Sequence, residues 1–159
     1  MSTNAYVAKR AIYARLLELA RTGPLSTLGS DGRPLQIRYD GRAGGTDPML
    51  DRCIYGGGVT FTRDADRAIV DGGDYLYPER VMSLWYVRLV AASDVDQRDL
   101  DVDAERVCDV FGQVFVDEPG IAGGNSRTFI EGGQGDYSLD AVEGLSIVTF
   151  EVVTETSIR

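Results

Sequence analysis

The chain has 159 residues, of which 43% are hydrophobic and 26% are charged, a composition typical of one folded domain over residues 1–159. No apolar run approaches the roughly 20 residues that cross a bilayer, and the first ten residues lack the apolar core of a secretory signal, so we expect neither a membrane span nor export. The formal net charge of −9 argues against a sequence-specific DNA-binding surface, because such surfaces are usually basic.

The first predicted element is a helix over residues 4–21. The pair Gly23-Pro24 follows it as a stop signal. Apolar side chains recur through this segment at the spacing of one helical face: Ala5, Ala8, Ile12, Leu16 and Leu19. We therefore expect an amphipathic helix that packs on the rest of the domain.

Alternating apolar and polar residues then predict short, half-buried strands at residues 35–40 and 59–63. The segment between them, residues 41–58, is rich in glycine, and we expect a long loop there. Loops of this length in compact domains are commonly functional. Residues 64–80 predict turns and an edge segment around Pro78.

Residues 81–90 form the most apolar stretch of the chain. Both faces of a strand in this segment are mainly apolar, which predicts a central strand covered on both sides or paired with a neighbouring subunit. After an acidic turn, the apolar spacing of residues 104–115 predicts a helix with Asp101 as its N-cap. This helix is expected to pack on the sheet and to direct Asp103 and its other charged residues outward.

A second glycine-rich segment, residues 120–135, is expected to be loop with one short strand at 127–131. The β-branched residues of 145–155 predict a closing strand. The expected fold class is therefore α+β: a mainly antiparallel sheet, an N-terminal helix, a second helix packed on one face, and long glycine-rich loops.

The residues of the common catalytic sites are missing. The chain has no histidine, which excludes a Ser-His-Asp triad and a Cys-His pair, and Lys9 is the sole lysine, so no P-loop sequence exists. Cys53 and Cys108 belong to no CxxC pair, so we expect free thiols rather than a zinc site. Asp99 begins a pattern resembling a calcium loop, but Ala104 occupies the position that requires glycine. We expect no catalytic, cofactor-binding or metal-binding residues; a small carboxylate-dependent hydrolase remains the alternative, since the chain has 25 acidic residues.

The order of elements resembles that of the tail terminator and tail completion proteins of long-tailed phages. The resemblance covers nearly the whole chain and is carried by the N-terminal helix, "YPERVMSLWYVRLVAAS", "DAERVCDVFGQVF" and "LSIVTFEVVTE". It implies a structural virion protein, not an enzyme, that forms a ring, typically of six copies, capping the tail tube and joining it to the neck beneath the portal. The implied partners are further copies, the tail tube protein, neck proteins and DNA passing through the lumen, with assembly in the host cytoplasm. Another neck or tail-tube subunit is the alternative of the same class.

Two groups of residues are expected to act in such a ring. Residues 1–42 hold seven basic and three acidic side chains, so the negative charge lies in the remainder. One group is acidic and is expected to line or border the DNA channel, where it repels phosphates: Asp94, Asp96, Asp99, Asp101, Asp103, Glu105 and Asp109. The other group is apolar and is expected to contact neighbouring subunits: Met49, Ile54, Tyr55, Ile121 and Phe129. The alternatives are acids that face outer solvent and glycine-rich segments that fold back on their own subunit.

Overall fold

The computed structural model describes residues 5–29, 35–41, 52–67, 69–71, 74–76, 78–92, 96–123, 126–138 and 143–156. Its elements follow in chain order: α1 (Ala5–Thr22), η1 (Pro24–Gly29), β1 (Gln36–Arg38), β2 (Arg52–Arg63), η2 (Ala65–Arg67), β3 (Ile69–Asp71), β4 (Asp74–Leu76), β5 (Glu79–Ala92), α2 (Gln97–Asp117), β6 (Ser126–Ser138) and β7 (Glu143–Thr156).

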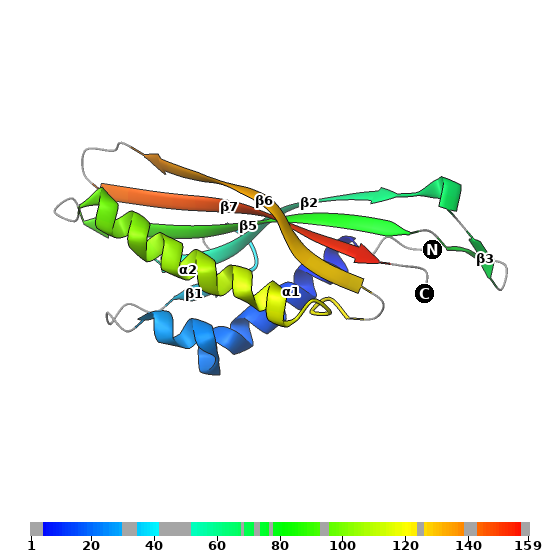
Figure 1. Cartoon of the computed structure of the whole chain (residues 1–159), viewed down its shortest axis with the longest axis horizontal. Coiled ribbons are helices and arrows are strands. Elements are labelled where there is room, and N and C mark those ends of the chain that lie inside the picture. The colour runs from blue at the N-terminus through cyan, green and yellow to red at the C-terminus, as the bar shows by residue number, and fades with distance from the viewer. Residues whose placement is uncertain are drawn as a thin grey trace.

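Five strands form one sheet in the order β1-β2-β5-β7-β6, and β3 pairs with β4 in a separate two-stranded sheet. β1 runs parallel to β2, whereas the other strand pairs are antiparallel. Both α-helices lie on one face of the larger sheet (Figure 1). The α+β architecture predicted from the sequence is therefore confirmed. Neither helix in the described part of the chain is long and apolar enough to cross a membrane.

β5 is the central strand, as its two apolar faces predict. It pairs with β2 on one side and with β7 on the other over most of its length. Trp85 and Val87 point toward the helices and are buried, while Leu84 and Tyr86 lie half-buried on the opposite face. Buried residues of α1, α2 and the helix-covered face of the sheet form one hydrophobic core.

α2 begins earlier than the sequence predicts. Its N-cap is Asp96, not Asp101, and the Asp96 carboxylate accepts a hydrogen bond of 2.8 Å from the backbone N–H of Arg98. The apolar stripe lies where its spacing places it, with Phe111 and Phe115 buried against the sheet. The Phe111 ring lies 5.0 Å from that of Phe150 on β7, so the helix is held by aromatic contacts.

The glycine-rich segments contain more strand than the sequence predicts. Residues 52–58 belong to β2, and residues 126–138 form β6, so neither stretch is loop. The neighbouring strands provide backbone partners that outweigh glycine's low strand propensity. At Gly133 the strands approach so closely that a Cβ atom would lie 2.5 Å from the carbonyl oxygen of Thr149. The remainder of the first segment, residues 42–51, lies outside the described residues.

The sheet is longer than the helices that cover it (Figure 1). β2 and β5 stay paired as far as Arg63 and Glu79, beyond a register shift between Gly56 and Val59. We call residues 59–67 and 78–83 the arm. Phe61 on the arm is an exposed aromatic residue, at 47%. Val81 and Ser83 on the β5 side of the arm are buried, so the exposed surface of the arm is that of β2, where Thr60 and Thr62 are exposed as well.

Candidate interaction surfaces

The acidic residues expected at the DNA channel gather mainly on the exposed side of α2. Asp94 lies outside the described residues, and Asp96 is used as the N-cap. Hydrogen bonds from the side chain and backbone of Arg98 lower the pKa of Asp96. Four further acids are exposed along the helix: Asp99, Asp101, Glu105 and Asp109. The structure therefore places most of these acids on the exposed side of α2, where Arg98 and Arg106 are exposed among them.

Asp103 does not point outward as predicted. It is half-buried and forms an ion pair with Arg52 at the start of β2, whose side chain is 1% exposed. Arg106 also donates to the Asp103 carboxylate, at 3.0 Å. A buried guanidinium requires a charged partner, so Asp103 joins α2 to the sheet and is not available for a channel.

The five expected intersubunit residues have different environments. Met49 lies outside the described residues, and Ile54 has no exposed surface because it packs in its own subunit's core. Because of this burial, the Ile54 side chain cannot contact a neighbouring subunit. Tyr55 stacks on Tyr86 at 4.8 Å on the sheet face opposite the helices, and Phe129 on β6 is half-buried. Ile121 is partly buried against the subunit's own core.

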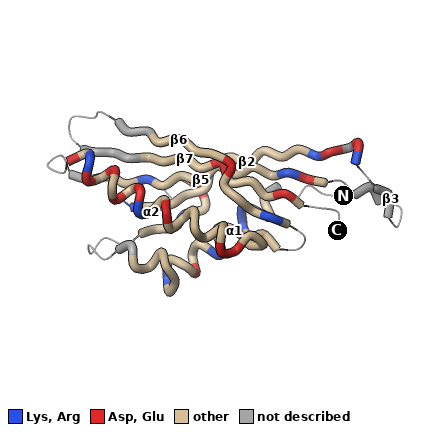
Figure 2. Tube along the Cα trace, in the orientation of Figure 1, with Lys and Arg blue, Asp and Glu red and all other residues tan. Residues whose placement is uncertain are grey.

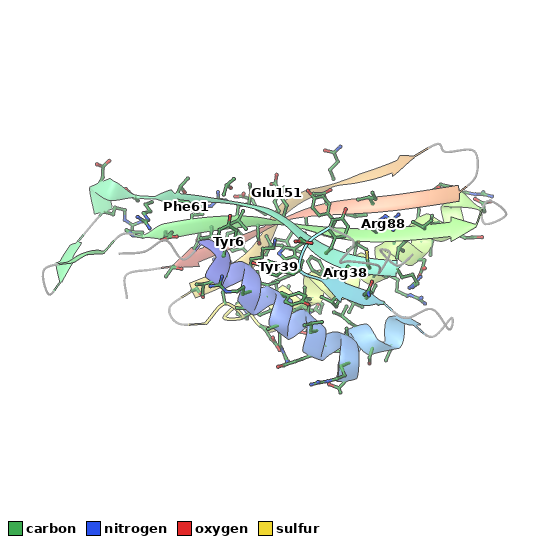
Figure 3. The ribbon with its side chains drawn as sticks, turned by 180° about the vertical axis from the view of Figure 1, so that it is seen from behind. Tyr6, Arg38, Tyr39, Phe61, Arg88 and Glu151 are labelled. Carbon is green, nitrogen blue, oxygen red and sulfur yellow. The ribbon has the colours of Figure 1, made fainter. Side chains whose placement is uncertain are left out.

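The face of the sheet opposite the helices carries cations and aromatic rings at neighbouring positions. The strand register places Arg38 of β1 beside Tyr55 of β2, and Arg88 of β5 beside Cys53 of β2. Figure 3 labels the two arginines. Burial raises the pKa of Tyr55, and it raises the pKa of the neighbouring Cys53 thiol to about 11 despite the two arginines. Cys53 is therefore held as a protonated thiol, the form that is not a nucleophile.

The second thiol has the same character. Cys108 on α2 has a pKa raised to about 12 by burial and by the nearby carboxylates of Asp109 and Glu105. Both cysteines are free, as the sequence predicts. Among the described residues, no group of three or more histidine, cysteine or acidic side chains is placed to hold a metal ion.

Lys9 connects α1 to the bulge of β2. Its side chain is 5% exposed, and its Nζ donates to the Gly57 carbonyl at 2.9 Å while lying 4.1 Å from the centre of the Tyr39 ring. Burial lowers the Lys9 pKa, and the charge of Asp40 opposes this only in part. A Cβ atom at Gly56 would lie 2.6 Å from the Tyr39 carbonyl oxygen, so this packing requires glycine. The contact fixes the helix against the point where the arm departs.

Two hollows flank the C-terminal half of α2. A groove of about 610 Å³ lies between α2 and the edge strand β6, and Gly112, Phe115, Val116, Phe129 and Ile130 are among its lining residues. A smaller hollow of about 150 Å³ lies between α2 and the end of α1. Beside it, Arg15 of α1 pairs with Glu118, which lowers the Glu118 pKa and links the two helices.

The two helices carry opposite charge. α1 contains four basic residues and one acidic residue, whereas α2 contains six acidic residues and two basic ones. Figure 2 marks these charges along the chain trace. The helix layer is therefore polarised, with a basic helix beside an acidic one.

No protein-family model matches the chain, and no curated protein matches it in sequence.

Two important contacts were not predicted from the sequence. The Lys9 contact had a partial signal, since the sole lysine lies beside the apolar stripe of its helix and a run of three glycines occurs elsewhere. The pairing of Arg52 with Asp103 had none, because their separation of 51 residues hides it until the sheet is assembled.

Proposed function

We propose that the chain is a structural virion protein, a subunit of a hexameric ring that caps the tail tube of a long-tailed phage and joins it to the head–neck connector. The proposal starts from the resemblance in element order noted above. It extends to the partners that such a ring requires: further copies of the chain, the tail tube protein and neck proteins.

The arm is the observation that carries this proposal. β2 and β5 run past both helices (Figure 1), with β5 still paired to β7 on its other side. Phe61, labelled in Figure 3, is exposed on β2 in this part of the sheet. Glu79 is buried at the same end, and its carboxylate lies 3.5 Å from Nε of the partly exposed Arg63, so an ion pair joins the two strands of the arm. A well-paired end of the sheet that carries an exposed aromatic side chain is suited to contact with a neighbouring molecule.

In this proposal, the start of α2 lines the wall of the ring's lumen. Asp99 and Asp101 are exposed there, and Asp96 precedes them as the N-cap. Negative groups on a channel wall repel DNA phosphates, so DNA passes without binding. Asp103 is left out of this surface because it pairs with Arg52.

The oligomeric state of the purified chain tests the proposal. We expect rings with a central hole by electron microscopy, and a hexamer mass by mass photometry. The rings should bind the ends of purified tail tubes and stop their growth. A chain that stays monomeric at high concentration, or that polymerises into long tubes by itself, contradicts a terminator role; tubes support the tail-tube alternative.

A further inference from the structure

The outer face of α1 carries an exposed stripe with three apolar and two basic residues. The stripe follows the helical spacing i, i+3, i+7, i+10 and i+14: Val7, Arg10, Ala14, Leu17 and Arg21. All five side chains are exposed, with Val7 at 43% and Leu17 at 41%. The stripe lies opposite the buried face of the helix, which is formed by Ile12 and Leu16.

The outer face of α2 carries a matching stripe of opposite charge. Its members are also spaced by three or four residues: Val102, Glu105, Asp109, Gln113 and Val116. Val102 is 64% and Val116 is 72% exposed, although valine is usually buried. Like the α1 stripe, it places exposed apolar side chains on a line with charges of one sign.

The charged members of the two stripes have no partner within the described part of the subunit. Arg10, Arg21, Glu105 and Asp109 form no ion pair there, unlike Arg15 and Arg106, which do. α2 lies nearest the viewer in Figure 1, whereas α1 lies nearest in the view from behind in Figure 3. No ion pair joins the charged residues of the two stripes within the described part of the subunit.

We propose that the α1 stripe of one copy docks on the α2 stripe of the next copy. The occupant of each stripe is thus a second copy of this chain, because the apolar residues and the charges of one stripe complement those of the other. The contact is head-to-tail, since each copy uses a different helix on each of its two sides. Such a contact repeats around a closed ring; to this extent the inference rests on the proposed function.

Charge reversal and charge exchange test the pairing. The variant Arg10→Glu/Arg21→Glu makes the α1 stripe acidic, and Glu105→Arg/Asp109→Arg makes the α2 stripe basic. We expect each double variant to raise the concentration for half-assembly by about tenfold or more, because like charges then face each other. The two double variants mixed in equal amounts should assemble again, and so should the chain that carries all four changes.

The control is Glu151→Arg, which reverses a charge on β7 on the sheet face opposite the helices, away from both stripes and from the arm. It should assemble like the wild type. Circular dichroism and thermal unfolding of each variant show whether the subunit itself remains folded, and recovery on mixing requires folded subunits. The particle mass is measured by analytical ultracentrifugation at several salt concentrations, and assembly should weaken as salt rises.

Each outcome separates the pairing from the ring. Wild-type rings that survive both reversals overturn the helix pairing and leave the ring proposal standing. If each charge reversal abolishes assembly, mixing the two variants restores it, and the particles contain only two copies, the helix pairing is supported and the ring is overturned. A wild type that is monomeric at every concentration overturns both the helix pairing and the ring. If the reversals abolish assembly and mixing the two variants does not restore it, the helix pairing is overturned.

Discussion

Lys9 is a buried cation, and its titration should make the free energy of unfolding depend on pH. Burial lowers its pKa below the ordinary value of 10.5. Between the lowered value and 10.5 the unfolded chain binds more protons than the folded chain, so this group makes stability rise with pH. We expect the free energy of unfolding of the wild type to increase relative to that of Lys9→Met as the pH rises toward 10.5, measured by urea unfolding. A difference independent of pH would refute this account.

Asp103 should differ from its neighbours on the same helix. Asp103→Asn leaves the buried Arg52 guanidinium without its carboxylate, and we expect a loss of about 1–3 kcal/mol in the free energy of unfolding. Asp101→Asn is the matched control, because Asp101 is exposed and its change should stay within about 0.5 kcal/mol. Equal effects in denaturant unfolding would show that the Arg52 pair does not stabilise the fold.

At the scale of elements, the bulge of β2 contains two glycines, two positions apart, that should tolerate a side chain differently. A methyl group at Gly56 would meet the Tyr39 carbonyl oxygen at 2.6 Å, whereas nothing lies within 4 Å of a Cβ atom at Gly58. Gly58 also has no positive φ. We expect Gly56→Ala to cost about 1–3 kcal/mol through overpacking and Gly58→Ala to be neutral or slightly stabilising, by thermal unfolding. Similar melting temperatures for the two variants would contradict this packing.

The contact between α2 and the sheet depends on Phe111. Its side chain is fully buried, with the rings of Phe115 and Phe150 at 5.1 and 5.0 Å. Phe111→Ala should cost about 3–5 kcal/mol, because it leaves a cavity between helix and sheet. Gln113→Ala on the exposed side serves as the control and should change the free energy of unfolding by less than about 0.5 kcal/mol. A small effect at Phe111 would mean that the core relaxes into the space.

Elements with strong local periodicity could be predicted from the sequence, and elements defined by their partners could not. α1, β5 and β7 follow from their apolar spacing, which is a property of each segment alone. β6 contains three glycines, and only pairing with β7 makes it a strand. The N-cap of α2 was misplaced because several aspartates precede the apolar stripe and any of them satisfies the capping preference.

The candidate site was predictable only in its composition. The excess of acids in and before α2 is visible in the sequence, but the separation of Asp103 from the exposed acids depends on a contact with β2. Likewise, the apolar character of Ile54 is visible, whereas its complete burial follows from the packing of two helices on the sheet. Long-range contacts of this kind carry no local signal.

At the scale of the whole molecule, the ring proposed above predicts that the acids at the start of α2 control whether DNA is retained in its lumen. Asp99→Asn/Asp101→Asn removes two exposed charges without touching the cap or the Arg52 pair. We expect rings of this variant to retain DNA in a filter-binding assay, with retention falling as salt rises. Asp64→Asn/Asp66→Asn on the arm is the control and should release DNA like the wild type. Release by both variants would place the α2 acids on the outer wall.

The burial of Lys9 also determines how the folded protein reacts with acylating reagents. It carries the one side-chain amine of the chain, and every other basic side chain is an arginine. Reagents that acylate amines therefore have no exposed side chain to modify while α1 lies on the sheet. Acylation of Lys9 requires the helix to lift from the bulge, so the modification rate, followed by mass spectrometry, reports a local opening at the root of the arm.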